Sequence, residues 1–361
     1  MRTKLWRPFR SVAAFALVTA VSAGLIACSP SSSETNNSES GNSASVAASS
    51  AHSSAGAEVT TVPRAAEVHA AGPVSAQIPP ADPEVLLTDP RPSAGYDYQR
   101  ILTLDRAGAL SRVVYNLGLG ERLVGRDMAS DFPAIADLPN LTPGGHTVNP
   151  EAVLKLNPEV IITDGTIGPS RVFDTFEKAG VKVIRVADNY TPDTIPTLID
   201  DVATGLGLAD QAGAVADKVA ADLAEATAYA QAKADGRSMM VLYVRGTGVA
   251  MIAGPKTGGR SLITRLGGVD AGAEVGIEGS FTPLTPEALI AAAPETIIVM
   301  SGGLESVGGV EGLLEVPGVA QTPAGKNRSI LDVPDTQLLS FSSQTPRALR
   351  AMADALYGEE K

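Results

Sequence analysis

The fold is decided by a stretch of sixteen residues that the chain uses twice. Residues 149–164 have the sequence NPEAVLKLNPEVIITD, and residues 285–300 have the sequence TPEALIAAAPETIIVM. The two copies keep one register, 136 positions apart, from the first proline to the end of the β-branched run. A unit repeated once at this distance indicates two similar lobes rather than a solenoid of short repeats. Two lobes leave a cleft between them, and a cleft is the usual place for a ligand.

Each copy predicts a short helix followed by a buried strand. Asn149 and Thr285 suit the N-cap, the prolines behind them suit the first helical position, and Glu151 and Glu287 favour the positive end of the helix dipole. The helix has to stop before the second proline of each copy, and the β-branched run that follows is typical of a buried strand. The sequence therefore predicts an α/β fold of two Rossmann-like lobes with mainly parallel sheets.

The flanking sequence continues the alternation of helix and strand. Strands are expected at residues 100–104, 123–125, 181–186 and 239–244, and helices at residues 107–117, 172–179 and 262–266. Between the lobes, residues 194–234 are apolar and acidic with helical spacing, and residues 210–234 alone predict a helix of about 37 Å. One long helix between two lobes permits a small rocking motion and resists wide closure.

The N-terminus predicts the compartment. Four basic residues lie within the first ten positions, and an apolar run of 15 residues follows at 11–25. This run is shorter than the roughly 20 residues that span a bilayer, but it suits a signal peptide. It leads into Leu25-Ile26-Ala27-Cys28, which resembles the lipobox of bacterial lipoproteins, where the cysteine is acylated. We expect a signal peptide at residues 1–27, a lipid anchor on Cys28 and tethering at the outer face of the cell membrane.

The rest of the chain divides by composition. Residues 28–95 are rich in Ser, Asn, Ala and Pro, which predicts a lipidated, flexible stalk. We expect the first lobe at residues 96–191, the linking helix at 192–236 and the second lobe at 237–361. Without residues 1–27 the chain keeps 24 of its 28 basic residues against 40 acidic ones, a net charge of −16. An acidic chain without basic runs argues against nucleic acid as a partner.

The histidines narrow the chemistry. His146 is the only histidine outside the predicted stalk and lies in Gly144-Gly145-His146-Thr147, just before the first repeated helix. A lone histidine in a glycine-rich loop is most often an exposed loop residue. A catalytic zinc site needs three protein ligands, and no Gly-x-Ser-x-Gly elbow is present. A hydrolase or redox enzyme is therefore disfavoured, and we predict that the protein is not an enzyme.

Tyr243 is the second candidate ligand. It ends the first strand of the second lobe, and ligands of open α/β sheets bind beyond the carboxyl ends of strands. Arg245 lies on the same face because side chains alternate along a strand. A guanidinium beside a phenol favours the phenolate, which is a hard anionic ligand for ferric iron. The alternative is a strand-end tyrosine that only packs against an arginine. Met300 ends the repeated strand, so it is expected to line the pocket.

Together, the lipobox, the Gly-Gly-His146-Thr loop and Tyr243-Val244-Arg245 resemble the substrate-binding proteins of bacterial ABC importers for haem, siderophores and cobalamin. Over residues 97 to 361 they are most similar to the HmuT-type haem-binding lipoproteins of actinobacteria. The resemblance implies two lobes joined by one long helix, the class III architecture. It also implies His146 and Tyr243 as axial ligands of ferric haem, with Arg245 as partner of the tyrosine.

The resemblance implies partners as well. Proteins of this family dock on their permease through one acidic residue per lobe, and the matching positions are Glu151 and Glu287. The expected partners are the ABC permease with its ATPase, and surface haem-receptor proteins as a source of haem. Arg126, Arg171 and Lys256 are candidates for the haem propionates. A ferric siderophore or cobalamin remains the alternative ligand, in which case His146 and Tyr243 would be incidental.

Overall fold

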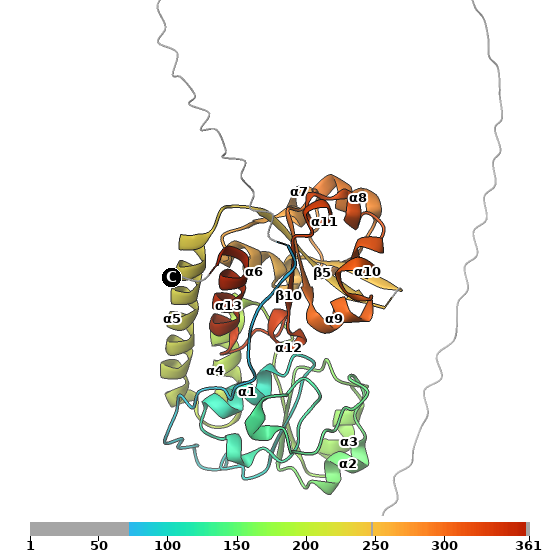
Figure 1. Ribbon diagram of the computed structural model, residues 1–361. Coiled ribbons are helices and arrows are strands. Elements are labelled where there is room, and N and C mark those ends of the chain that lie inside the picture. Colours follow the sequence, from blue (N-terminus) through green and yellow to red (C-terminus); the bar gives the residue numbers. More distant parts are fainter. Residues whose placement is uncertain (1–71, 247, 359–361) are drawn as a thin grey trace, which may run out of the picture. The chain divides into compact units, whose positions relative to one another are not determined.

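The computed structural model describes residues 72–246 and 248–358, which form two α/β lobes (Figure 1). The first lobe has a parallel sheet in the order β2 (Ile101–Leu104), β3 (Val160–Thr163) and β4 (Lys182–Arg185). Its helices are α1 (Ala109–Asn116), α2 (Pro150–Lys155) and α3 (Val172–Lys178). The predicted signal peptide, the predicted lipid anchor Cys28 and most of the predicted stalk lie outside the described residues.

The second lobe is built on a seven-stranded sheet in the order β1-β10-β9-β5-β6-β8, with β7 beside β5. β6 runs antiparallel to both of its neighbours, and the other pairs are parallel. The strands are β1 (Val74–Ser75), β5 (Ser238–Arg245), β6 (Val249–Ala253), β7 (Val269–Asp270), β8 (Phe281–Pro283), β9 (Thr296–Met300) and β10 (Ile330–Val333). The helices are α6 (Gly259–Arg265), α7 (Ala271–Glu274), α8 (Pro286–Ala292), α9 (Ser301–Ser306), α10 (Gly309–Glu315), α11 (Pro323–Asn327) and α12 (Asp335–Leu338). The prediction of an α/β fold with mainly parallel sheets is confirmed.

The two copies of the repeat form the same pair of elements, α2 with β3 and α8 with β9. The Asn149 side chain accepts hydrogen bonds from the backbone N–H groups of Glu151 and Ala152, at 2.9 and 3.4 Å. Thr285 accepts from the N–H of Ala288 at 3.2 Å. These contacts satisfy N–H groups that a helix leaves free in its first turn, as the predicted caps require.

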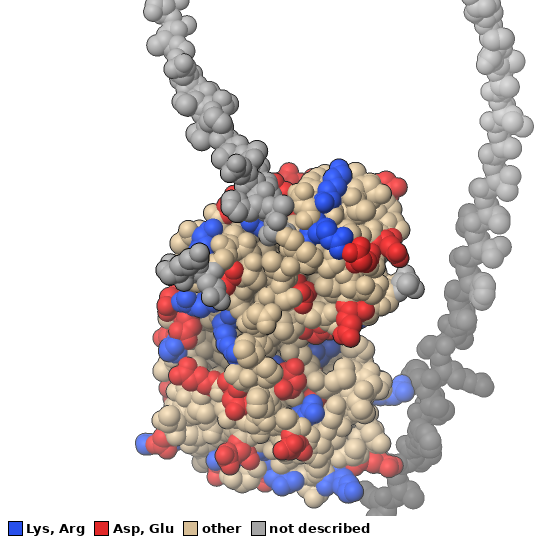
Figure 2. All heavy atoms as spheres, viewed as in Figure 1, with Lys and Arg blue, Asp and Glu red and all other residues tan. Residues whose placement is uncertain are grey.

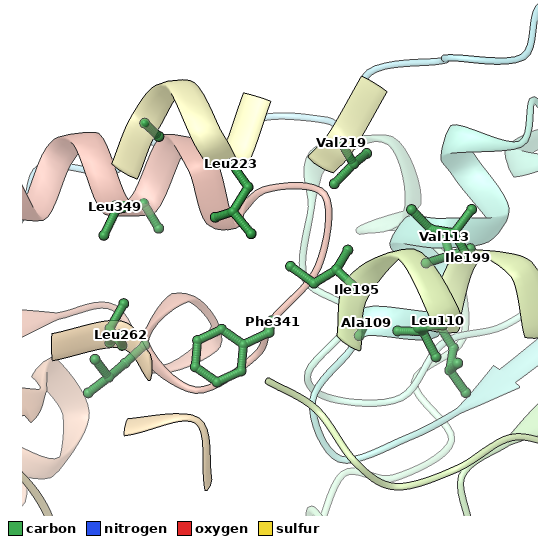
Figure 3. Packing of buried hydrophobic residues seen from close by; sticks show 14 of the residues in the cluster. Ala109, Leu110, Val113, Ile195, Ile199, Val219, Leu223, Leu262, Phe341 and Leu349 are labelled. Atoms are coloured by element: carbon green, nitrogen blue, oxygen red, sulfur yellow. The ribbon is translucent and has the colours of Figure 1, made fainter. Parts of the chain in front are cut away.

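A layer of three helices runs along one side of both lobes (Figure 1). It consists of α4 (Ile195–Gly205), α5 (Ala209–Lys233) and α13 (Thr345–Tyr357), and α5 packs against the other two. Helix α5 has 25 residues and begins one residue before the predicted long helix. Figure 3 shows Phe341 between Leu262 of α6 and Ile195 of α4, within one apolar cluster that reaches from the first lobe into the second. This shared core restricts relative movement of the lobes.

Two sequence predictions are wrong. Residues 123–125 form no strand, and only an isolated bridge pairs Leu123 with Ile101. The predicted stalk also extends too far, because β1 pairs with β10 and the N–H groups of Leu86 and Leu87 donate to the carbonyl of Asn116 at 2.9 Å. The prolines of this segment prevent the regular spacing of apolar residues that marks a helix or a strand, but an extended segment can still pack against the lobes. Along the described chain, none of the helices combines the length and apolarity that spanning a membrane requires.

Candidate ligand-binding site

The two lobes face each other across a hollow that Figure 2 shows on the surface. Helices α9 and α12 follow β9 and β10 and lie on the side of the second lobe that faces the first (Figure 1). The carboxyl ends of these strands are therefore directed at the first lobe. This is the edge at which open α/β sheets bind ligands.

A polar contact joins the lobes next to this edge. The Thr336 hydroxyl of α12 donates to Asp131 Oδ2 at 2.9 Å, and Arg112 Nη2 donates to Asp131 Oδ1 at 2.8 Å. The Arg112 side chain is 1% exposed and also donates to the carbonyl of Gly108 at 2.6 Å. A buried guanidinium with fixed partners holds Asp131 at the lobe boundary.

The second lobe presents an apolar surface around Tyr243. Pairing across β5, β6 and β8 places Tyr243 opposite Met251, and Met251 opposite Pro283. The Tyr243 and Phe281 rings lie 5.5 Å apart. Phe281 and Val249 are 41% and 40% exposed. We call Tyr243, Val249, Met251, Phe281 and Pro283 the tyrosine face.

The tyrosine face emerges from the core at the end of β5. Met239 and Val241, on the same face of the strand, are buried in the apolar cluster that also contains Leu262 of α6. Tyr243 and Arg245 lie beyond this cover and are partly exposed. On this face, the strand therefore has its first residues in the core and its last two partly exposed.

Arg245 lies over the tyrosine ring, with its guanidinium carbon 5.0 Å from the ring centroid. Its Nη2 donates to Asp335 Oδ2 at 2.5 Å and to Met300 Sδ at 3.5 Å. The structure thus brings together three residues predicted from sequence, Tyr243, Arg245 and Met300. Among the described residues, no hydrogen bond joins Arg245 to the tyrosine hydroxyl, so the contact with the phenol is through the ring face. Asp335 was not predicted.

The first lobe offers an exposed imidazole. His146 lies in the loop before α2, where the N–H of Gly168 donates to the His146 carbonyl at 3.0 Å. The backbone is held in place, while no hydrogen bond or ion pair between described residues restrains the imidazole. Met128, which is 51% exposed, lies beside this loop, because a Cβ placed on Gly145 would be 3.4 Å from its Cε. The structure shows no direct contact between His146 and Tyr243.

Buried carboxyl groups lie under the first lobe's edge. Asp105 and Asp164 follow β2 and β3, and Asp127 accepts a hydrogen bond from the N–H of Asp105 at 3.2 Å. Burial raises the pKa of Asp105 well above its ordinary range, raises that of Asp127 to about 6, and also raises that of Asp164. Asp105 accepts from the N–H of Ala109, the first residue of α1, at 2.8 Å. The only sequence signal for this cluster was an aspartate directly after each of two strands.

These carboxyls do not form a metal centre. Throughout the described ranges, no group of three or more His, Cys, Asp or Glu side chains is placed to hold a metal ion. Two cavities, of about 470 and 520 Å³, lie elsewhere, and neither is lined by His146 or Tyr243.

The remaining predicted residues are placed as follows. Arg126 donates to the backbone carbonyls of Ala136, Asp127 and Ser130. Arg171 and Lys256 are exposed. Glu151 and Glu287 are exposed in the first turns of α2 and α8. These four exposed side chains form no ion pair within the described part of the chain.

Comparison with known proteins identifies the family. The family model described as periplasmic binding protein matches residues 107–336. The chain belongs to the periplasmic binding protein family. It thereby has the two-lobed, class III fold that the sequence predicted. None of the curated proteins compared with the chain matches it.

Several solved members of the family are similar to the chain. The crystal structure of the haem-binding protein HmuT has 37% identity and a TM-score of 0.73, with 80% of this chain and 98% of that chain covered. The apo periplasmic haem-binding protein RhuT from Roseiflexus sp. RS-1 has 36% identity and a TM-score of 0.66, with 72% and 98% covered. Further HmuT structures carry single alanine substitutions of a histidine, a tyrosine and an arginine two positions after that tyrosine.

Proposed function

We propose that the protein binds ferric haem between its lobes, with His146 and Tyr243 as axial ligands, and delivers it to the permease of an ABC importer. The observation that carries this proposal is the tyrosine face with Arg245 over its ring, in a chain 37% identical to the haem-binding protein HmuT. The tyrosine and arginine replaced in the HmuT variants have the same spacing as Tyr243 and Arg245. As a carrier the protein makes and breaks no substrate bonds, so it is not an enzyme.

The tyrosine face suits the body of haem. Porphyrin is a flat and largely apolar disc, and exposed Phe281 and Val249 provide apolar area beside the tyrosine ring. Covering these side chains with porphyrin removes apolar surface from water, which favours binding by about 25 cal/mol per Å² buried. Met128, which is exposed on the first lobe beside the His146 loop, is a further apolar side chain that we propose contacts the porphyrin.

The two axial ligands suit ferric iron. A neutral imidazole donates through a ring nitrogen, and tyrosine binds ferric haem as phenolate after losing its hydroxyl proton. The Arg245 guanidinium lies 5.0 Å from the ring centroid, where its positive charge attracts an iron-bound phenolate. Because His146 is exposed and unrestrained, its imidazole is free to turn towards iron.

Exposed basic side chains are the candidates for binding the propionates. Arg171 and Lys256 are exposed and without ion-pair partners in the described structure, so each can pair with a carboxylate. Arg126 is already committed to three backbone carbonyls and is the weaker candidate.

Membership of the periplasmic binding protein family supports an extracytoplasmic location and an ABC permease as partner, and we propose that haem is delivered to this permease and its ATPase. We propose that Glu151 and Glu287 dock the two lobes on that permease. We further propose that Cys28 carries a lipid anchor at the outer face of the membrane and that surface haem-receptor proteins supply the haem.

A hemin titration tests the ligand assignment. Residues 29–361 should bind one hemin per chain with a sharp Soret band and a ferric-tyrosinate charge-transfer band. Tyr243→Phe should remove the charge-transfer band, because only a phenolate supplies that transition, and His146→Ala should shift the Soret band. Matched controls are Tyr96→Phe, which changes an exposed tyrosine outside the tyrosine face, and His69→Ala, which lies outside the described residues.

The same titration separates the alternatives. Absence of a saturable spectral change at one hemin per chain would discard haem and leave a ferric siderophore or cobalamin as the ligand. A charge-transfer band that survives Tyr243→Phe would retain haem but overturn the tyrosine assignment.

A further inference from the structure

Asp335 binds Arg245 next to the tyrosine face, although no pattern in the sequence indicated it as a site residue. It is the first residue of α12, directly beyond the carboxyl end of β10, and its side chain is 38% exposed. Its Oδ2 accepts from Arg245 Nη2 at 2.5 Å, and its Oδ1 accepts from the N–H of Gly302 at 2.8 Å. Both oxygens are therefore engaged, one by the backbone and one by the guanidinium.

The contacts around Arg245 show what Asp335 contributes. The remaining partners of the guanidinium are neutral, namely the Val244 carbonyl at 3.1 Å and the Met300 sulfur at 3.5 Å. Thioether sulfur is a weak acceptor, so the carboxylate is the strongest partner. Backbone anchoring through Gly302 fixes that carboxylate in space.

We propose that Asp335 is a positioning residue that holds Arg245 over the Tyr243 ring and thereby sets the electronic environment of the iron-bound phenolate. This inference rests on the proposed function. The hydrogen bonds of Asp335 go to Arg245 and to the Gly302 backbone, not to the tyrosine, so it acts through Arg245. Without it, the long arginine side chain gains rotamers that carry its charge away from the ring.

The next residue links this arrangement to the first lobe. Thr336 donates to Asp131, whose other oxygen is held by buried Arg112. Asp335 thus binds Arg245, and the next residue, Thr336, binds Asp131 of the first lobe. Both residues belong to the four-residue helix α12, so this helix connects the tyrosine face to the contact between the lobes.

The test is a double-mutant cycle on the hemin complex at one pH, measuring the wavelength of the charge-transfer band. Removing a cation from the phenolate raises its donor level, so Arg245→Ala should shift the band to longer wavelength. If Asp335 acts through Arg245, Asp335→Ala should shift it in the same direction, and the double variant should match Arg245→Ala alone. Asp335→Asn keeps one acceptor oxygen and loses the other, so it can accept from Arg245 or from Gly302 but not from both, and it should shift the band part of the way towards Asp335→Ala.

A second readout is the rate of hemin transfer to an excess of apomyoglobin. Asp335→Ala and Arg245→Ala should each raise that rate about fivefold to tenfold, again without adding in the double variant. Glu311→Ala is the matched control, because it removes an exposed ion pair with Arg328 elsewhere in the same lobe. It should leave both the band and the rate unchanged.

The outcomes distinguish the inference from the function on which it rests. An unchanged protein with no charge-transfer band would overturn tyrosine ligation itself. A normal band that Arg245→Ala shifts and Asp335→Ala does not would overturn only the role of Asp335. Additive shifts in the double variant would also overturn it, since they would show that Asp335 acts independently of Arg245.

Discussion

At the scale of single residues, alternation along one strand predicted the pairing of Tyr243 with Arg245, and the structure places both beyond the cover of the core. Asp335 could not be predicted in the same way. It lies 90 positions from Arg245, and only the adjacent carboxyl ends of β5, β9 and β10 bring the two together. Contacts within an element follow from its period, whereas contacts between elements depend on sheet order, which no local pattern in this chain specifies.

Asp127 carries a prediction about pH. Burial raises its pKa to about 6 from an ordinary value of 3.8, so the folded protein binds this proton more tightly than the unfolded chain does. Its stabilisation is complete below pH 4 and is lost as the pH rises through 6. Replacing Asp127 by Asn should remove about 2 kcal/mol from the fall in unfolding free energy between pH 4.5 and pH 7. Urea unfolding at the two pH values measures this difference.

Asn cannot reproduce both hydrogen bonds that Asp127 accepts, so Asp127→Asn lowers stability at every pH. The quantity to compare is therefore the slope of unfolding free energy against pH, not the stability at one pH. Asp137→Asn, at an exposed position ten residues further along the chain, is the control and should leave the slope unchanged. Equal slopes for the unchanged protein and Asp127→Asn would show that this carboxyl has no raised pKa.

At the scale of elements, capping and proline signals predicted α2 and α8 together with the strands behind them. Asn149 and Thr285 make the expected hydrogen bonds, because cap geometry depends only on residues within one turn. The predicted strand at 123–125 failed for the opposite reason. A three-residue apolar run becomes a strand only if a neighbour offers a full ladder, and Leu123 finds one bridge to Ile101.

The repeated helices carry a prediction about transport. Replacing both Glu151 and Glu287 by Ala should leave hemin affinity unchanged and abolish hemin uptake by cells, because these carboxylates are exposed and lie outside the tyrosine face. Growth on hemin as the iron source measures uptake. Glu121→Ala combined with Glu274→Ala removes one exposed carboxylate from each lobe elsewhere and should leave uptake intact. Normal uptake without Glu151 and Glu287 would show that they do not dock the permease and only interact favourably with the helix dipole.

At the scale of the molecule, the length and position of the linking helix α5 followed from composition, but the role of residues 72–95 did not. This segment, which we call the strap, pairs with β10 in the second lobe and then reaches the first lobe. There the buried Asn116 amide donates to the Glu84 carbonyl at 2.7 Å. Proline-rich composition predicts an extended chain but cannot tell whether its backbone groups meet water or protein.

Truncation tests the strap. A chain of residues 96–361 should be less stable to urea than one of residues 72–361 by about 3–5 kcal/mol, since it loses several hydrogen bonds worth about 1 kcal/mol each and leaves the Asn116 amide without its partner. A chain of residues 80–361 lacks the β1 pairing, the hydrogen bond from Arg347 to the Pro79 carbonyl and the packing of Ala76, but keeps the contacts of residues 84–87, so it should lie between them. Equal stability of the three chains would show that the strap does not stabilise the fold and belongs to the flexible stalk, as the sequence predicted.

The central claim is that one lobe supplies an imidazole and the other a phenolate to the same iron. Resonance Raman spectroscopy of the ferric hemin complex, excited in the charge-transfer band, tests this most directly. We predict phenolate ring modes and an iron–oxygen stretch that vanish in Tyr243→Phe and persist in His146→Ala with an altered iron environment. Absence of phenolate modes in the unchanged protein, or their persistence in Tyr243→Phe, would contradict the account.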